Sequence, residues 1–266
     1  MIRDITLGQY FPGESWIHRL DPRIKIIATL LFVVELFIVD SFWGFLAAVI
    51  ALAVVIKVSK VPLSFILRGL KPIFLIIAIT FVMNLFVIPG RVLVEVGPFS
   101  ITEEGVYTAF FMAARLILLI IGSSLLTLTT KPMSLTDGIE ALLSPFSKIG
   151  VPAHELAMMM TIALRFIPTL IEETDKIMKA QQARGADFES GNIIHRAKNL
   201  VPILIPLFIS AFRIAHDLAM AMEARCYRGG QFRTRLNAMK FQKRDLAASI
   251  MLAAFLGVII LIRIIL

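Results

Sequence analysis

The sequence predicts an all-α integral membrane protein, with about five transmembrane helices and a basic, helix-rich cytoplasmic region before the last of them. Two observations predict this class. Of the 266 residues, 58% are hydrophobic and only 17% are charged, whereas roughly 25% of the residues of a soluble domain are charged. The apolar residues also occur in long blocks, which is typical of segments that cross a bilayer.

Five apolar blocks are candidate transmembrane helices. They comprise residues 24–39, 42–56, 72–89, 106–130 and 246–266. A helix needs roughly 20 residues to cross about 30 Å of hydrocarbon, and flanking Lys and Arg side chains extend the shorter blocks to the interface. The sequence therefore predicts four transmembrane helices within residues 1–130 and a C-terminal one within residues 245–266.

The distribution of Lys and Arg predicts the orientation in the membrane. The N-terminal segment, the loop that follows Lys57 and residues 131–244 are rich in these residues, whereas the loop that follows Gly90 has one. Cytoplasmic segments carry the excess of Lys and Arg, so we expect the N-terminus and residues 131–244 inside the cell. The first residues contain no apolar stretch typical of a cleavable signal peptide.

Residues 131–244 form the predicted cytoplasmic-side region. One short helix is expected from Ser134 to about Pro145, and two long amphipathic helices are expected at residues 153–183 and 193–228. Parts of residues 153–222 are apolar enough to cross a bilayer, and a pair of additional spans satisfies the charge distribution as well. We favour helices that lie in or against the inner membrane face.

Two similar tripeptides lie near the C-terminal ends of the long helices. They are Ala183-Arg184-Gly185 and Ala224-Arg225-Cys226. Small neighbours let a partner approach closely, and the rigid fork of an Arg guanidinium suits carboxylates and backbone carbonyls. The simpler interpretation is that each Arg complements its helix dipole.

These tripeptides, together with the heptad Arg19-Leu-Asp-Pro-Arg-Ile-Lys25, give the chain a resemblance to a known family. It resembles the membrane scaffold, or T component, of energy-coupling factor (ECF) transporters, over essentially its whole length. ECF transporters are ABC-type importers of vitamins and transition-metal ions in prokaryotes. The resemblance therefore implies a multi-pass protein of a prokaryotic cell membrane.

The resemblance also implies partners and roles. The two Arg motifs are expected to dock on two ABC ATPase subunits, and the long helices to transmit ATP-driven motion to one substrate-binding membrane subunit, the S component. The chain itself is expected to be non-catalytic and to bind no metal, cofactor or nucleic acid. A phosphate-binding loop requires a Gly-Lys dipeptide, and the sequence contains none, so ATP is hydrolysed by the partners.

The N-terminal heptad has a local structural interpretation as well. Asp21 followed by Pro22 predicts an N-cap with Pro at the first helical position, which begins the first transmembrane helix. Arg19, Arg23 and Lys25 are then expected to anchor the inner membrane interface.

Two charged residues fall within predicted transmembrane helices, Glu35 in the first and Arg115 in the fourth. Charges inside a bilayer are costly and are usually paired or functional. The distances of the two residues from the ends of their helices place them at nearly the same depth. We therefore predict a Glu35–Arg115 ion pair that fixes how these helices pack.

Two other classes of function remain as alternatives. A self-contained secondary transporter or channel should show inverted repeats or broken helices around a midplane site, and no repeat is apparent. An intramembrane protease is suggested by fragments similar to the prenyl-protein protease superfamily, which are Glu172-Glu173, His195, Asn199 and His216. That pattern requires an Arg at position 177, where this chain has Ile, and Glu172 with Lys176 is an ordinary i,i+4 pair.

Overall fold

The computed structural model describes residues 10–96, 99–186, 188, 193–229 and 239–265. Within it the chain forms two compact units. The first, here called the bundle unit, consists of residues 8–139 and 239–266. The second, here called the long-helix unit, contains residues 140–238. Residues 230–238 of the predicted basic region 131–244 lie outside the described residues.

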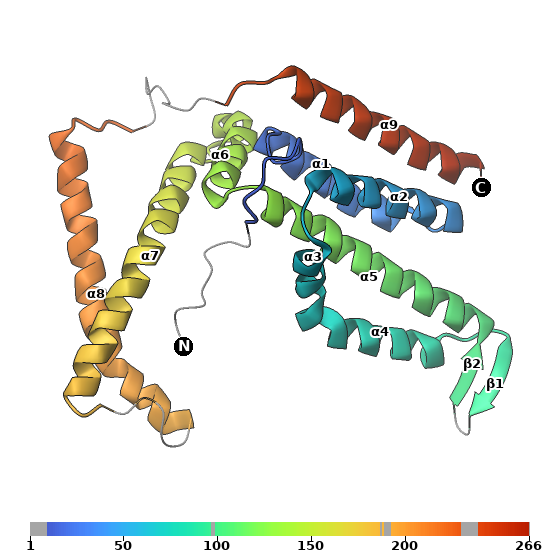
Figure 1. Cartoon of the computed structure of the whole chain (residues 1–266), viewed down its shortest axis with the longest axis horizontal. Coiled ribbons are helices and arrows are strands. Elements are labelled where there is room, and N and C mark those ends of the chain that lie inside the picture. The colour runs from blue at the N-terminus through green and yellow to red at the C-terminus, as the bar shows by residue number, and fades with distance from the viewer. Residues whose placement is uncertain (1–9, 97–98, 187, 189–192, 230–238, 266) are drawn as a thin grey trace. The chain divides into compact units, whose positions relative to one another are not determined.

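The bundle unit is built around helix α5 (Glu103–Thr129), which packs against α1, α2, α3 and α4 (Figure 1). The C-terminal helix α9 (Lys243–Ile265) packs against α1 and α2. The bounds of the remaining helices are α1 (Pro22–Ile38), α2 (Phe42–Ser59), α3 (Leu63–Leu70), the 3₁₀ turn η1 (Lys71–Ile73), α4 (Phe74–Val87) and α6 (Pro132–Leu143), whose last residues belong to the long-helix unit.

The N-cap predicted at Asp21 is confirmed, and the structure adds a second cap at Ser41. The Asp21 carboxylate accepts a hydrogen bond from the Arg23 backbone N–H at 2.9 Å, and Pro22 opens α1. The Ser41 hydroxyl accepts one from the Gly44 N–H at 3.2 Å and opens α2. These bonds satisfy N–H groups that have no partner within the helix, so the short connection between α1 and α2 separates two well-defined helices.

Two elements were not predicted. Residues in the loop after Gly90 form an antiparallel hairpin of β1 (Val92–Val96) and β2 (Phe99–Thr102). Part of the basic loop after Lys57 is helical and forms α3 (Leu63–Leu70), so the predicted third span is only the last part of a longer helical segment. Thr102 ends β2 and also caps α5, because its hydroxyl accepts from the Gly105 N–H at 3.0 Å.

The all-α membrane class is confirmed, because six helices of the described chain are long and apolar enough to cross a membrane. Four of these helices lie in the bundle unit and correspond to predicted spans two to five. The predicted first span corresponds to α1, which has 17 residues. The remaining two of the six apolar helices are α7 and most of α8. These two helices have the length and apolarity that the alternative with two additional spans requires.

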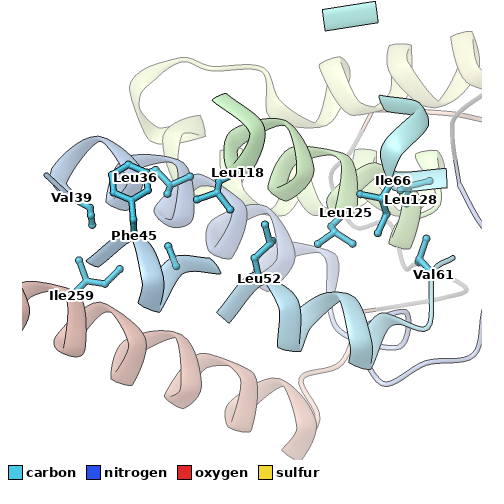
Figure 2. Packing of buried hydrophobic residues seen from close by; sticks show 11 residues of the cluster. Leu36, Val39, Phe45, Leu52, Val61, Ile66, Leu118, Leu125, Leu128 and Ile259 are labelled. Carbon is cyan, nitrogen blue, oxygen red and sulfur yellow. The ribbon is translucent and has the colours of Figure 1, made fainter. Parts of the chain in front are cut away.

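A buried apolar cluster holds the bundle unit together (Figure 2). Leucines at positions 118, 125 and 128 of α5 contribute one side of it. The other members come from α1, α2, α3, α9 and the connecting turns, and comprise Leu36, Val39, Phe45, Ala48, Leu52, Val61, Ile66 and Ile259. Burial of each large aliphatic or aromatic side chain away from water stabilises a fold by roughly 1.5–3 kcal/mol, and inside lipid the gain comes from close packing instead.

The long-helix unit consists of the end of α6, the 3₁₀ segment η2 (Ser144–Ile149), α7 (Ala153–Ala183) and α8 (Ile193–Ala224). Helix α7 packs against α8 and η2. The predicted bounds of α7 are confirmed. Helix α8 ends four residues before the predicted position, since the chain turns at Arg225 and Cys226.

Candidate partner-docking ends of the two long helices

Helix α7 ends in a hydrogen-bonded turn that presents Arg184. The Ala186 N–H donates to the Gln181 carbonyl at 3.0 Å, and the Gly185 N–H donates to the Gln182 carbonyl at 2.9 Å. This pair of bonds defines a Schellman motif, in which the residue after the C-cap has a positive φ. Gly185 occupies that position with φ +88°, which a residue without a side chain adopts at no steric cost.

Helix α8 ends in the same motif and presents Arg225 at the equivalent position. The Tyr227 N–H donates to the Met222 carbonyl at 3.0 Å, and the Cys226 N–H donates to the Glu223 carbonyl at 2.8 Å. Arg184 and Arg225 are thus the C-cap residues of two turns with one hydrogen-bond pattern. The two tripeptides detected in the sequence therefore share a local structure and not only a composition.

Cys226 is the unusual member of the second turn. It adopts φ +55°, a left-handed conformation that costs a residue with a Cβ roughly 1–2 kcal/mol. The sequence comparison of the two tripeptides treats Cys226 only as a small residue. The left-handed backbone conformation of Cys226 is a property of the folded turn that the residue pattern did not predict.

Both arginines are exposed, as are their small neighbours Ala183, Gly185, Ala224 and Cys226. Among the described residues neither guanidinium has a hydrogen bond or ion pair. An Arg that served only its own helix would lie over the last carbonyls. Here two exposed five-donor groups, without a bond among the described residues, are available to carboxylates or carbonyls of another molecule.

The two ends lie at opposite extremities of the α7–α8 pair. The Tyr227 hydroxyl, two residues after Arg225, donates to the Met158 sulfur at 2.9 Å and also contacts His154 in the first turn of α7. Arg184 caps the other end of α7. At a rise of 1.5 Å per residue, the helix from Met158 to Arg184 places the two arginines on the order of 40 Å apart.

The N-terminal heptad contributes to a buried polar network in the bundle unit. The Asp245 carboxylate is 1% exposed and accepts hydrogen bonds from the Asp21 N–H at 2.9 Å and the Gln242 N–H at 2.8 Å. One carboxylate therefore ties the first residues of α1 to the start of α9. Arg23 follows in the same network, with its guanidinium over the Phe241 ring and 3.9 Å from the Asp21 carboxylate.

Lys25 differs from the prediction that it anchors the membrane interface. It is buried, and its ammonium donates to the His18 carbonyl at 3.2 Å, the Thr129 carbonyl at 2.9 Å and the Thr130 hydroxyl at 3.4 Å. The carbonyls at the C-terminal end of α5 need donors, and Lys25 supplies them. Arg19 remains exposed and pairs with Glu14 at 2.9 Å.

The predicted Glu35–Arg115 ion pair is not formed. The Arg115 guanidinium donates instead to the Val39 carbonyl at 2.9 Å and to the Asp40 carboxylate at 3.2 Å, at the end of α1. Among the described residues, both carboxyl oxygens of Glu35 are buried without a hydrogen-bond partner. The pair was predicted from equal depth in the membrane, but in the folded chain Arg115 donates to the carbonyl and carboxylate that follow α1.

Of the residues that suggested a protease, the Glu173 carboxylate forms an ion pair within α7. Glu173 pairs with Lys176 at 3.7 Å, so the ion pair is i,i+3 rather than the predicted Glu172–Lys176 pair. The side chain of His195 lies outside the described residues. No group of His, Cys, Asp and Glu side chains among the described residues has an arrangement that would hold a metal ion.

The fold and the two arginine-capped helices define an all-α, multi-pass membrane protein. Comparison with known proteins identifies its family, because the model of the cobalt transport protein family CbiQ matches residues 13–236. The chain belongs to this family, which includes the transmembrane T components of ECF transporters. The resemblance found in the sequence is thereby confirmed.

Several relatives carry the description energy-coupling factor transporter transmembrane protein EcfT. The protein of Thermosediminibacter oceani is 62% identical over 249 residues, which cover 94% of each chain. The protein of Clostridium kluyveri is 60% identical over 266 residues, which cover 99% of this chain and 98% of the relative. That of Bacillus subtilis is 43% identical and covers 99% of this chain and all of the relative. The chain is thus a multi-pass protein of the cell membrane and a membrane subunit of a transporter complex.

Proposed function

We propose that this chain is the non-catalytic scaffold of an ECF importer and couples two ATPase subunits to a substrate-binding membrane subunit. One observation carries the proposal, namely that two exposed arginines without a partner in the described chain cap α7 and α8 in the same turn geometry. Two helix ends with the same turn geometry can bind two partners of the same kind, and a pair of ATPase subunits provides such partners.

The long-helix unit also has the apolar surface that such a coupling element needs. Large apolar side chains of α7 and α8 are exposed in it, including Met159, Leu204, Phe208, Phe212 and Met220. Met-rich apolar surfaces adapt to more than one partner. We assign this surface to the substrate-binding subunit, and the substrate, a vitamin or another micronutrient, would be selected by that subunit.

Exchanging both arginines for acids tests the docking role. We expect Arg184→Glu with Arg225→Glu to release the ATPase subunits from the purified complex, or to uncouple ATP hydrolysis from transport, since each docking cation becomes an anion. The double variant Lys176→Glu with Arg228→Glu is the matched control, because it makes the same change in net charge at exposed residues outside the caps. Normal association and normal transport in the arginine double variant would refute the proposal.

The orientation has its own test, because Cys226 is the only cysteine of the chain and is exposed. If the caps face ATPases in the cytoplasm, a membrane-impermeant maleimide should label Cys226 only after the cells are opened. The Lys and Arg distribution supports this orientation. Labelling of Cys226 in intact cells would place the docking ends outside the cell and contradict the proposed orientation.

A further inference from the structure

The turn that follows α8 is tied to the first turns of α7 by side-chain hydrogen bonds. The His154 imidazole lies between two partners, with Nδ1 3.0 Å from the Glu140 carboxylate and Nε2 3.3 Å from the Tyr227 hydroxyl. The Tyr227 hydroxyl lies 2.9 Å from the Met158 sulfur. These residues come from the end of α6, the start of α7 and the end of α8, and all belong to the long-helix unit.

The contact is sheltered enough to hold its geometry. The side chains of His154 and Glu140 are 28% and 15% exposed, and Tyr227 and Met158 are also partly buried. Hydrogen bonds that are partly shielded from water lose less of their energy to competing solvent. Tyr227 is also the residue whose N–H closes the Schellman turn of Arg225, so one residue joins the arginine cap to the side-chain contact.

The end of α7 has no equivalent tie. Residues 182–185 are exposed, and in the described chain their side chains make no hydrogen bond or ion pair with another element. The two arginine caps therefore share a backbone turn but differ in their attachment. Arg225 lies on a turn that is bonded to the neighbouring helix, whereas among the described residues the turn of Arg184 is bonded to its own helix alone.

We propose that Tyr227, His154 and Glu140 are positioning residues that fasten the Arg225 cap to the start of α7 and so fix the distance between the two arginine caps. We call these three residues the latch. With the latch bonds formed, the start of α7 and the end of α8 move as one body. Without these bonds, the end of α8 pivots against α7. The proposed consequence for transport rests on the docking function, because only docked caps transmit the motion of a motor.

The spacing of the caps can be measured on the full chain in lipid nanodiscs. Spin labels on native Cys226 and on Gln182→Cys report the distance between the two turns, which we expect as one narrow distribution near 40 Å. Tyr227→Phe keeps the ring and removes the hydroxyl. We expect this change to widen the distribution about twofold, because the bonds from the turn after α8 to His154 and to Met158 of α7 both end on that hydroxyl.

Matched variants separate the latch from a general effect of the substitution. Tyr107→Phe removes a hydroxyl from an exposed residue of α5 that makes no hydrogen bond to any described residue, and it should leave the distribution unchanged. His154→Leu breaks the same latch from the other side and should reproduce the effect of Tyr227→Phe. A distribution that stays narrow in both Tyr227→Phe and His154→Leu would overturn the proposal.

A second measurement connects the latch to coupling. In the assembled transporter, Tyr227→Phe should keep the ATPase subunits bound and ATP hydrolysis intact, while substrate imported per ATP falls at least twofold. A residue needed only for folding would lower both rates together. If the ATPase subunits still bind the arginine double variant and transport is normal, the proposed docking function is refuted, and the cap spacing still tests the positioning role of Tyr227, His154 and Glu140. If the cap spacing does not respond to changes in these residues, the positioning role is refuted and the docking function is unaffected.

Discussion

The two units of this chain use apolar residues in different ways. In the bundle unit, α1, α2, α3, α5 and α9 all contribute to one buried cluster, and the ends of α1, α5 and α9 are joined by buried polar bonds. In the long-helix unit, α7 has 31 residues, of which only Ala153 and Ala157 are buried, and most large apolar side chains of α8 are exposed. The bundle unit buries one apolar cluster and joins its helix ends by polar bonds, whereas the long-helix unit exposes most of its apolar surface and, among the described residues, its two capping arginines have no partner.

The difference shows why apolar content alone does not distinguish a membrane core from a coupling element. Both units contain helices that are apolar and long enough to cross a bilayer. What separates them is the fate of the polar groups, because a self-contained core must satisfy buried donors and acceptors internally.

The largest effect is expected from Asp245→Ala in the bundle unit. The change leaves the Asp21 and Gln242 N–H groups without their carboxylate acceptor, and loss of a buried, charge-assisted hydrogen-bond pair costs about 3 kcal/mol. We expect a clear fall in the thermal midpoint of the purified protein in detergent. Asp217→Ala removes an exposed carboxylate from α8 and should change the midpoint little. Equal midpoints for the two variants would show that the network does not stabilise the bundle unit.

The two helix caps predict effects of opposite sign for similar substitutions. Gly185→Ala places a Cβ at φ +88° and should destabilise the end of α7 by about 1 kcal/mol. Cys226→Gly relieves a residue at φ +55° and should stabilise the end of α8 by up to about 1 kcal/mol. Hydrogen exchange of the amides in the two turns measures both changes. Faster exchange at the end of α8 in Cys226→Gly would contradict the assigned turn.

Several features that depend on residues close together in the sequence were predicted correctly, whereas contacts between distant residues were not. The bounds of α7, the N-cap at Asp21 and the similarity of the two arginine motifs all follow from short-range rules of helix ends. The burial of Lys25 does not, because two of its three acceptors lie about 100 residues further along the chain. The acceptors of Arg115 likewise depend on how α1 and α5 pack. Helical periodicity and depth in the membrane do not determine this packing.

Glu35 gives the next smaller effect and distinguishes the structure from the ion pair predicted by sequence. Its two carboxyl oxygens are buried without a hydrogen-bond partner among the described residues, and replacing an unsatisfied buried polar group by an apolar one of similar size removes a desolvation cost. Glu35→Leu should therefore raise the thermal midpoint, by an amount equivalent to about 1 kcal/mol. A lower midpoint, matched by the midpoint of Arg115→Leu, would restore the Glu35–Arg115 pair.

The smallest effect concerns the pH dependence of the bundle unit and depends on His18. The imidazole is hydrogen-bonded to Ser15 and to the Phe11 carbonyl. Burial lowers its pKa below the ordinary value of 6.5, the Lys25 charge lowers it further, and the bond to the Phe11 carbonyl opposes the shift. Below about pH 6.5 the unfolded chain therefore binds more protons at this site than the folded chain does, so acid favours unfolding.

Thermal midpoints at about pH 7.5 and pH 5.5 test this contribution in the window where the unfolded histidine becomes protonated. The native chain should lose more stability between the two values than His18→Gln, which has no group that titrates there. His216→Gln, at an exposed position of α8, controls for removal of a histidine from the other unit and should keep the native pH dependence. An equal loss in the native chain and in His18→Gln would mean that the folded and unfolded states bind this proton equally, and that acid sensitivity of the bundle unit has another source.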